Sequence, residues 1–451
     1  MSNETVDATR DTDDDAPSRR ARPGVLIVFS GAEPMFLAIP MTAKGIAVGR
    51  GTGDGGLLPD DRLSRRHATI DFAPGGGWTV RDLGSRNGTF VDGQRLQGSA
   101  TFASPKAIRA ADTLLVTCDD LAALPPSLRD GQVVVGARLS AALAKVARAA
   151  QASPTLLLRG ESGTGKENAS RHFHALGPNR SGPFVAVNCA AIPEGLAERL
   201  LFGAKRGAYS GAAVDSEGHV QAAHGGVLLL DEGGELGLDV QSKLLRVLET
   251  REVVPLGASH GQHVDFRICV ATHRDLREAV SQGRFRADLY HRIAPPEVVL
   301  PPLRERLDEI AEHVVAEVAD VAPSLRPHSK LVEACMLRAW PGNVRELRKE
   351  VRHAAVQAQA EGADRVRVDH LSANAGRPFE APASAEEPRS KRGGQARGYV
   401  RWSEAIDRER IERALKEHGG NVALAARALG MQRTQMYREM ARWSIPRPKR
   451  G

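Results

Sequence analysis

Short apolar runs broken by glycine and aspartate characterise residues 24–124. The runs include Val25–Phe29, Trp78–Val80 and Thr89–Val91, the last followed directly by the turn pair Asp92-Gly93. Several short strands separated by such turn signals are typical of antiparallel sandwiches. The pattern therefore predicts an all-β sandwich over residues 24–124.

A different pattern begins at about residue 132 and continues to residue 371. Short apolar segments alternate here with longer stretches of helical period. The segments expected to form buried strands are Leu156–Leu158, Val185–Val187, Val227–Leu230 and Ile268–Ala271. Parallel sheets are covered on both faces, so their strands are near-continuous apolar runs that alternate with helices. We expect a central α/β domain over residues 132–371.

Apolar positions recur with helical spacing from Ile406 to Leu415 and again from Val422 to Leu429. This pattern predicts an all-α domain over residues 401–451. The polar, aspartate-rich residues 1–23 are expected to be disordered. Residues 125–131 and 372–400 contain proline, glycine and charge without apolar period, and we interpret them as linkers.

Charge is concentrated at one end of the chain. The net charge of the 451 residues is +7, and residues 401–451 alone hold twelve Lys and Arg against six Asp and Glu. A basic end of this kind suits a polyanion such as DNA, although a solvated tail has the same composition.

The cysteines and the hydropathy indicate a cytoplasmic protein. The four cysteines lie far apart in sequence and match no metal-binding spacing, which is typical of reduced thiols. No apolar run approaches the roughly 18 residues of a membrane span. The N-terminus is polar, so we expect no signal peptide there and no membrane partner.

A glycine-rich segment follows the first expected strand of the α/β domain. It contains Gly160, Glu161, Ser162, Gly163, Thr164, Gly165 and Lys166, and Glu167 comes next. A glycine-rich loop between strand and helix presents backbone N–H groups to phosphates, and its lysine adds a positive charge. A glycine-rich turn without ligand is the alternative.

The strand that ends at Asp231-Glu232 supplies the second half of a nucleotide site. Asp231 is expected to orient Mg²⁺, because Glu167 stands where a P-loop usually has the Ser or Thr that holds this ion. Glu232 is expected to polarise the attacking water as general base. ATP and Mg²⁺ are therefore the predicted cofactors, and Lys166, Asp231 and Glu232 are predicted to be catalytic.

The segment 160–167 resembles that of the bacterial enhancer-binding proteins, the AAA+ activators of sigma-54 RNA polymerase. The resemblance extends over residues 132–371 and includes the motifs at 184–189, 201–203, 241–246, 285–292 and 340–347. It implies that Asn188 restrains Glu232 and that Arg345 contacts nucleotide. It also implies that Arg286 and Arg292 are arginine fingers acting on a neighbouring subunit of a ring, by resemblance a hexamer.

A small aromatic-tipped loop lies between the two halves of the nucleotide site. It contains Gly207, Ala208, Tyr209, Ser210, Gly211 and Ala212. It resembles the family's Gly-Ala-Phe-Thr-Gly-Ala loop, which contacts the sigma-54 subunit, with an aromatic ring and a hydroxyl retained. Leu200 and His273 depart from the family pattern, at the coupling segment and the first sensor respectively, and place the coupling of hydrolysis to the loop in question.

The β-sandwich carries its own set of polar residues. Arg50, Ser64 and Arg65 offer charge-assisted bonds and a hydroxyl to a phosphate dianion. With Asn87 they resemble the forkhead-associated domain, which binds phosphothreonine peptides; by resemblance Asn87 holds the peptide backbone and His67 braces the loop. The ligand is expected to be a partner phosphoprotein or a phosphorylated segment of the chain itself, with Thr5, Thr9 and Thr12 as candidates.

The C-terminal segment has the pattern of a helix-turn-helix. Asn421 is a suitable N-cap for the first helix, and Gly430 follows that helix. The segment resembles the Fis-type DNA-binding domain, which dimerises. The residues expected to contact DNA are Arg433 and Gln435 at base edges and Arg438 and Arg442 at phosphates.

Together these features predict a transcription activator that binds DNA upstream of promoters. ATP hydrolysis would remodel the sigma-54 polymerase holoenzyme, and phosphothreonine recognition would gate the process. Two alternatives stay open. One is an ATPase that remodels a different target, and the other is a DNA-binding repressor with a vestigial ATPase.

Overall fold

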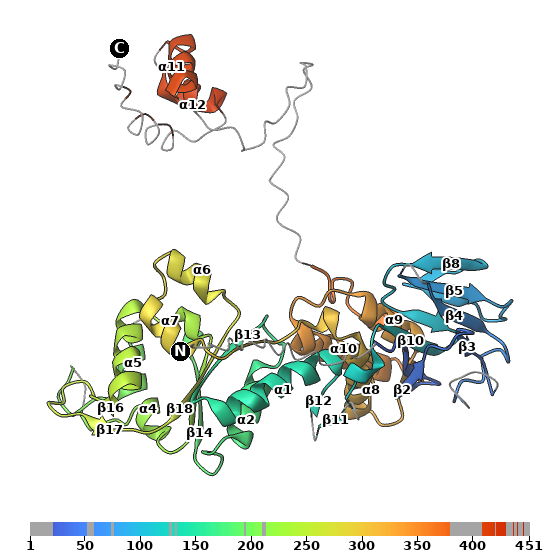
Figure 1. The fold of residues 1–451 in the computed structure, drawn as a ribbon, viewed down its shortest axis with the longest axis horizontal. Coiled ribbons are helices and arrows are strands. Elements are labelled where there is room, and N and C mark those ends of the chain that lie inside the picture. Colours follow the sequence, from blue (N-terminus) through green and yellow to red (C-terminus); the bar gives the residue numbers. More distant parts are fainter. Residues whose placement is uncertain are drawn as a thin grey trace, which may run out of the picture. The chain divides into compact units, whose positions relative to one another are not determined.

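The computed structural model describes residues 21–51, 58–73, 76–125, 129–130, 133–193, 195–209, 213–378, 408–419, 421–429, 436, 440 and 445. The chain divides into two compact units, Met1–Glu380 and Ala381–Gly451. The first unit contains a β-sandwich, an α/β domain and a helical lid, and the second contains a small helical domain (Figure 1).

The N-terminal part is the expected all-β sandwich. One sheet has the strand order β2-β1-β10-β9-β6-β7 and the other β3-β4-β5-β8, with antiparallel pairing throughout. The strands are β1 (Gly24–Ser30), β2 (Glu33–Pro40), β3 (Ile46–Val48), β4 (Ala68–Phe72), β5 (Trp78–Asp82), β6 (Thr89–Val91), β7 (Gln94–Arg95), β8 (Ser99–Phe102), β9 (Ile108–Ala110) and β10 (Thr113–Cys118).

Strand β1 is buried on both of its faces. Val25 and Ile27 lie in the core between the two sheets, with Trp78 from the opposite sheet. Leu26 and Val28 point the other way, as alternate residues of a strand must, and lie in a second core formed with the lid. The uninterrupted apolar run of this strand is thus explained by burial on two sides.

The α/β domain is built on a five-stranded parallel sheet of order β14-β15-β18-β13-β19. Its strands are β13 (Thr155–Arg159), β14 (Phe184–Asn188), β15 (Val227–Asp231), β18 (Arg267–Thr272) and β19 (Glu297–Val299). Its helices are α1 (Ala137–Ala152), α2 (Lys166–Leu176), α3 (Ala197–Phe202), α4 (His219–Ala222), α5 (Leu238–Thr250), α6 (Leu276–Ser281) and α7 (Ala287–Ile293). The four apolar segments expected to be parallel strands all lie in this sheet.

Helices cover both faces of this sheet, and the strand residues alternate between them. Leu156 and Leu158 pack in the core formed with α1 and α2, whereas Leu157 packs in the core formed with α3 to α7. Burial on both faces is what the near-continuous apolar runs predicted. The carboxyl ends of β13 and β15 therefore lie at the same edge of the sheet, separated by β18. This edge is where a ligand site is expected.

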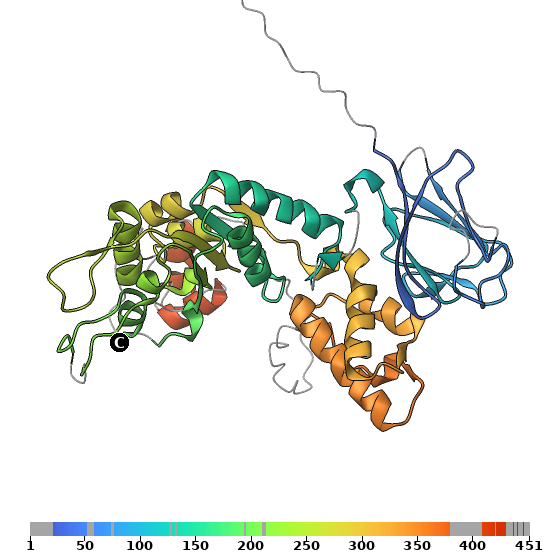
Figure 2. The same ribbon diagram turned by 90° about the horizontal axis from the view of Figure 1, so that it is seen from below.

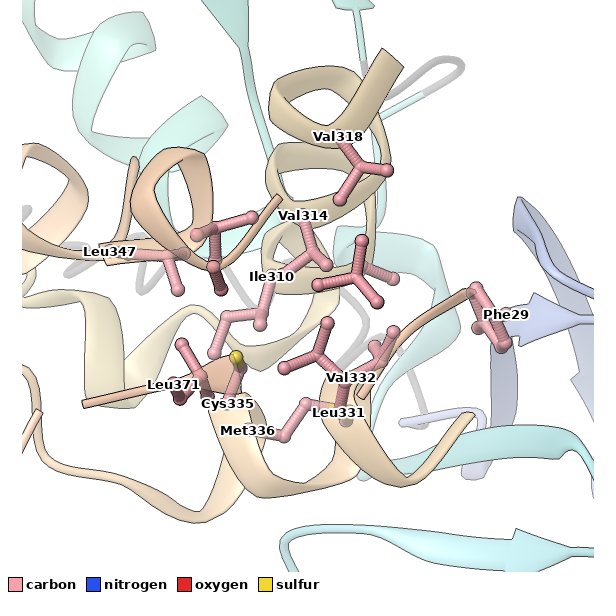
Figure 3. Close-up of a cluster of buried hydrophobic side chains, with 14 of the residues drawn as sticks. Phe29, Ile310, Val314, Val318, Leu331, Val332, Cys335, Met336, Leu347 and Leu371 are labelled. Carbon is pink, nitrogen blue, oxygen red and sulfur yellow. The ribbon is translucent and has the colours of Figure 1, made fainter. Parts of the chain in front are cut away.

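The lid follows β19 and packs against the sandwich. It contains α8 (Leu307–Val321), β20 (Arg326–Pro327), α9 (Ser329–Leu337), α10 (Asn343–Ala360) and β21 (Arg365–Val366). Phe29 of β1 lies in one core with Val314 of α8 and Val332 of α9 (Figure 3). Both ribbon views show the strands of the sandwich beside these helices (Figures 1 and 2). Sandwich and lid thus share a hydrophobic core.

Two segments expected to be linkers contribute to the fold where they are described. Residues 129–130 form β11 (Arg129–Asp130), which pairs with β12 (Val133–Val134). Ala375 is 3% exposed, and the backbone N–H of Trp340 donates to the carbonyl of Gly376 over 3.1 Å. The ordered lid therefore extends past the expected boundary at residue 371, because Gly376 lies against the Trp340 ring.

The remaining short elements are β16 (Glu252–Val253), β17 (Gln262–His263) and the 3-10 turns Leu121–Ala123, Cys189–Ala191, Gly233–Glu235, Leu303–Glu305 and Val368–His370. In the second unit, α11 (Arg408–Glu417) and α12 (Val422–Ala428) enclose a small core with Met436 and Met440. None of the helices within the described ranges is both long and apolar enough to span a bilayer.

Candidate functional site

The glycine-rich loop between β13 and α2 has the geometry of a phosphate cradle. Gly163 and Gly165 have φ angles of 78° and 103°, in the left-handed region that side chains rarely adopt. A Cβ on Gly163 would lie 2.2 Å from the carbonyl oxygen of Gly342 in the lid. Lys166 opens α2, and its buried Nζ donates to the carbonyl of Gly160 over 3.0 Å.

The acidic end of β15 faces this lysine. Glu232 Oε1 lies 3.4 Å from Lys166 Nζ, and Glu232 has a positive φ of 52°, an uncommon conformation that is often found at functional sites. Burial and the neighbouring charge of Glu232 raise the pKa of Asp231 above its ordinary value. The two carboxylates and the lysine are thus gathered at one edge of the sheet.

Glu232 is held by His273 at the end of β18. Its Oε2 lies 2.7 Å from His273 Nδ1 and accepts from the backbone N–H of that residue over 3.3 Å. Burial opposes ionisation, but the hydrogen bonds from His273 and the charge of Lys166 outweigh it, so the pKa of Glu232 is below its ordinary value. Asn188, expected to restrain Glu232, lines the same cavity but accepts through Oδ1 from the N–H of Ala190 over 3.0 Å.

Three lid residues that sequence reasoning missed hold the glycine-rich loop. Arg304 makes a bidentate ion pair with Glu161, at 2.7 and 2.9 Å. Asn343 Nδ2 donates to the carbonyl of Ser162 over 3.0 Å. The buried Arg306 donates through Nη1 to the carbonyl of Thr164 over 3.0 Å. These contacts join segments more than 140 residues apart, so no local spacing marks them.

A cavity of about 600 Å³ lies between the glycine-rich loop, the acidic strand end and the lid. Its polar lining includes Lys166, Glu167, Asn188, Asp231, Glu232 and Arg345. Arg345 Nη1 also approaches Ser162 Oγ at 3.4 Å. Val135, Leu139 and Leu143 give the cavity an apolar end, and the buried His313 also lines it. A charged phosphate end and an apolar end suit a nucleoside triphosphate.

The two arginines expected to act on a neighbouring subunit lie outside this cavity. Arg286 and Arg292 lie at the beginning and near the end of α7 and are exposed. Arg286 Nη2 pairs with Asp288 at 2.7 Å, and Arg292 Nη2 donates to the carbonyl of Leu248 over 3.0 Å. Neither lines the nucleotide cavity of its own chain.

The loop expected to contact sigma-54 rises from a paired base. Ala204 and Ser216 form an antiparallel bridge, and Lys205 Nζ pairs with Asp215 at 2.6 Å. Of the expected contact residues, Gly207, Ala208 and Tyr209 are described, and Ser210, Gly211 and Ala212 lie outside the described residues. Tyr209 is 37% exposed, and its hydroxyl accepts from Arg199 Nη1 over 2.6 Å.

The expected phosphate-binding residues of the sandwich lie on adjacent loops. The N–H of Arg50 donates to the carbonyl of Ser64 over 3.0 Å, and Asn87 Nδ2 donates to the carbonyl of Arg62 over 2.5 Å. His67 is fully buried and braces both loops, accepting from the N–H of Ser64 through Nδ1 and bonding the carbonyl of Gly88 through Nε2. Arg65 directly follows Ser64.

In the helical unit, Asn421 has the hydrogen bond expected of an N-cap residue. Asn421 Oδ1 accepts from the N–H of Leu424 over 3.2 Å, directly before α12. Arg433, Gln435, Arg438 and Arg442 lie outside the described residues, as do Thr5, Thr9 and Thr12.

Comparison with protein families assigns each part of the chain. Residues 134–299 match the Sigma-54 interaction domain and residues 304–387 the AAA+ ATPase lid domain. Residues 46–114 match the FHA domain, and residues 403–443 match the bacterial regulatory proteins of the Fis family.

The chain is similar to bacterial regulators over its larger part. The Nif-specific regulatory protein of Herbaspirillum seropedicae is 37% identical over 342 residues, 70% of this chain and 62% of that protein. The transcriptional regulatory protein GlrR of Escherichia coli is 35% identical over 301 residues, 66% of this chain and 64% of that protein. The chain thus spans somewhat over three fifths of the length of these relatives.

A solved structure is similar over the larger part of the chain. The crystal structure of NtrX from Brucella abortus in complex with ATP matches with a TM-score of 0.50 and 26% identity, over 71% of each chain.

Proposed function

We propose, on the premise that this chain belongs to the bacterial family of sigma-54-dependent transcriptional activators, that it is an ATP-driven activator of the sigma-54 polymerase. The observation that carries the proposal is the cavity in which Lys166, Asp231 and Glu232 meet below a lid anchored to the glycine-rich loop. The related NtrX was crystallised with ATP.

The residues around the cavity have separate roles in hydrolysis. Backbone N–H groups of residues 161–166 and the ammonium of Lys166 bind the phosphates. Glu232 accepts the proton of the attacking water, and its low pKa keeps it ionised for that purpose. Arg286 and Arg292 project to the next protomer and stabilise charge on its γ-phosphate, which makes a ring necessary for turnover.

Magnesium fits this site only with help from the nucleotide. No cluster of three or more His, Cys, Asp or Glu side chains suited to a metal is present within the described part of the chain. Asp231 would hold the ion together with phosphate oxygens of the nucleotide and water. The ion would neutralise charge on the phosphates.

Release of Glu232 from His273 is the trigger for catalysis in this proposal. In the structure the carboxylate is held by two hydrogen bonds to a residue at the end of β18. A general base must reach the attacking water, so this contact has to loosen or turn when nucleotide binds. His273 is therefore the group that sets the position of Glu232, and Asn188 lines the same cavity.

The loop around Tyr209, the sandwich and the C-terminal helical unit position and regulate the ATPase domain. Tyr209 at the tip of the loop contacts the sigma subunit, and the paired base at Ala204 and Ser216 transmits movement to it. The sandwich binds a phosphothreonine through Arg50 and Ser64 and reports a kinase signal. The Fis-type unit, as a dimer, holds the protein at an upstream DNA site.

Transcription with purified components tests the proposal. We expect the full chain to hydrolyse ATP with a rate per protomer that rises with protein concentration, and to open a sigma-54 promoter. Lys166→Ala should abolish nucleotide binding and activation while DNA binding is kept.

The alternatives give different results in the same assays. ATP turnover with no effect on a sigma-54 promoter would indicate a remodeller of another target. DNA binding with no ATP turnover at any protein concentration would indicate a repressor with a vestigial ATPase. Full activation by Lys166→Ala would refute the mechanism.

A further inference from the structure

A cleft of about 320 Å³ is lined by residues of the sandwich and of the lid together. Arg62 and Asn87 line it from the sandwich, and His328 and Lys330 line it from the lid, at the beginning of α9. Asn87 lies on the loop expected to hold a phosphothreonine peptide. The peptide site of the sandwich therefore opens onto the lid rather than onto solvent alone.

Polar contacts fix the two walls of the cleft. Arg109 Nε of β9 donates to Glu333 Oε2 of α9 over 2.7 Å, and both side chains are 6% exposed. The hydroxyl of Ser329 in α9 donates to Asp112 Oδ1 over 2.5 Å, and Asp112 Oδ2 lies 3.3 Å from Arg62 Nη1. With the shared core of β1, α8 and α9, these contacts hold the lid wall in place (Figure 3).

The charge of the cleft favours an anionic ligand. Its lining includes Arg62, Arg109 and Lys330. Arg62 is paired with Asp112 and Arg109 with Glu333, so the excess positive charge of the lining is that of Lys330. Lys330 is exposed, and no hydrogen bond or ion pair of its ammonium occurs within the described residues. His328 accepts from the N–H of Lys330 through Nδ1, so its Nε2 carries the proton and can donate.

The pKa of His328 is lowered by burial and by the positive charges near the cleft. Burial lowers the pKa of His328, and although Asp112 opposes this, the charges of Arg365, Lys330 and Arg62 add to it. Of these cations, Arg62 and Lys330 line the cleft together with His328. An acidic side chain entering the cleft would meet these two.

We propose that the lid completes the phosphothreonine site, and that Lys330 selects an acidic residue flanking the phosphothreonine of the bound peptide. The inference rests on the proposed phosphothreonine recognition by the sandwich. Arg50 and Ser64 take the phosphate, Asn87 takes the peptide backbone, and the chain beyond Asn87 runs along His328 and Lys330. The ligand class is an acidic phosphothreonine peptide.

The site has a direct connection to the nucleotide cavity. α9 packs in one core with Leu347 and Val351 of α10, the helix whose Arg345 lines the nucleotide cavity. A peptide that contacts α9 therefore contacts a helix that packs directly on a wall of the nucleotide cavity. Because coupling between two ligands is reciprocal, bound nucleotide changes the affinity for the peptide by the same factor.

Binding of fluorescent phosphothreonine peptides to the full chain tests the inference. The probe is a peptide set with a fixed phosphothreonine in which Ala, Asp or Lys replaces each flanking residue in turn, followed by anisotropy. We expect one flanking position to prefer Asp over Ala by about three- to tenfold, as a partly enclosed charge pair provides. Lys330→Glu should reverse this preference, and Lys349→Glu, an equally exposed charge reversal on α10, should leave it unchanged.

The outcomes separate the two levels of the proposal. If phosphopeptides bind and Arg50→Ala abolishes binding, but Lys330→Glu leaves every flanking preference as it was, the part assigned to the lid is overturned and the sandwich keeps its role. The role of the lid is also overturned if the wild type binds phosphopeptides but prefers Asp over Ala at no flanking position. If no phosphopeptide binds the wild type, phosphothreonine recognition itself is overturned, and the composite site with it.

Discussion

The buried ion pair between Arg109 and Glu333 gives a direct measure of how firmly the sandwich holds the lid. The pair joins β9 to α9 at 2.7 Å, and each side chain is 6% exposed. Within the described residues, Oε1 of Glu333 has no hydrogen-bond partner, so Arg109 is the main compensation for this carboxylate. Arg109 also stacks on Phe90, with its guanidinium carbon 3.9 Å from the ring centroid.

Replacing one residue of the Arg109–Glu333 pair should therefore lower the unfolding free energy much more than replacing both residues. Arg109→Met leaves a carboxylate buried without a counter-charge, which costs ~3–5 kcal/mol of unfolding free energy. The double replacement Arg109→Met with Glu333→Leu removes both charges at similar volume, and should lie within ~2 kcal/mol of the wild type. Arg62→Ala removes the exposed partner of Asp112, which keeps its hydrogen bond from Ser329, and should cost ~1 kcal/mol at most.

Denaturant unfolding followed by tryptophan fluorescence measures these values. The chain has four tryptophans, of which Trp78 in the sandwich is 1% exposed and Trp340 in the lid is 0% exposed. Variants that keep only one of these two therefore report the opening of the sandwich or of the lid. Because the domains share a core, both variants should show the same transition when the interface is intact. A cost under ~1 kcal/mol for Arg109→Met, or a double variant less stable than the single, would refute this account of the interface.

Three further predictions concern the nucleotide site and the sandwich. Gly163→Ala should lower nucleotide affinity by tenfold or more in a fluorescent-nucleotide titration, because its Cβ meets the Gly342 carbonyl; normal affinity would contradict the close approach. Arg286→Ala and Glu232→Gln should each be inactive as ATPases and should regain turnover when mixed, if the arginine acts on a neighbour; no rescue would count against action between subunits. Burial raises the pKa of Asp82, but hydrogen bonds from Ser85, Thr89 and the Gly84 N–H dominate and bring it to about 2. This depressed pKa stabilises the fold above pH ~4, and the advantage over Asp82→Asn should vanish as pH falls through about 2; a constant difference in unfolding free energy from pH 6 to pH 2 would exclude the account.

Features encoded by neighbouring residues were predicted from the sequence. The parallel strands, the glycine-rich loop before α2 and the acidic end of β15 each depend on local pattern and local spacing. The structure brings the predicted Lys166, Asp231 and Glu232 to one cavity, although their catalytic roles stay predictions. The sandwich was predicted in the same way, from turn signals between short apolar runs.

Features made by tertiary packing were not predicted. Arg304, Arg306 and Asn343 hold the glycine-rich loop from the lid, and single arginines in the short turn between β19 and α8 carry no sign of such a partner. The contact between Glu232 and His273 likewise joins the ends of two strands whose adjacency depends on sheet order. One available signal was overlooked: the unbroken apolar run of β1 indicates burial on both faces, whereas a sandwich strand with one solvated face alternates.

The two-sided burial of β1 limits how the β-sandwich can be exchanged for another domain, during evolution or by engineering. A cut near residue 125 would uncover Leu26, Val28 and Phe29 on one piece and Val314 and Val332 on the other. Apolar patches of that kind promote aggregation in either isolated piece. Replacing the sandwich by a different domain therefore requires polar side chains on the lid surface that now contacts β1. Homologues that lack the sandwich should already have polar side chains at these lid positions.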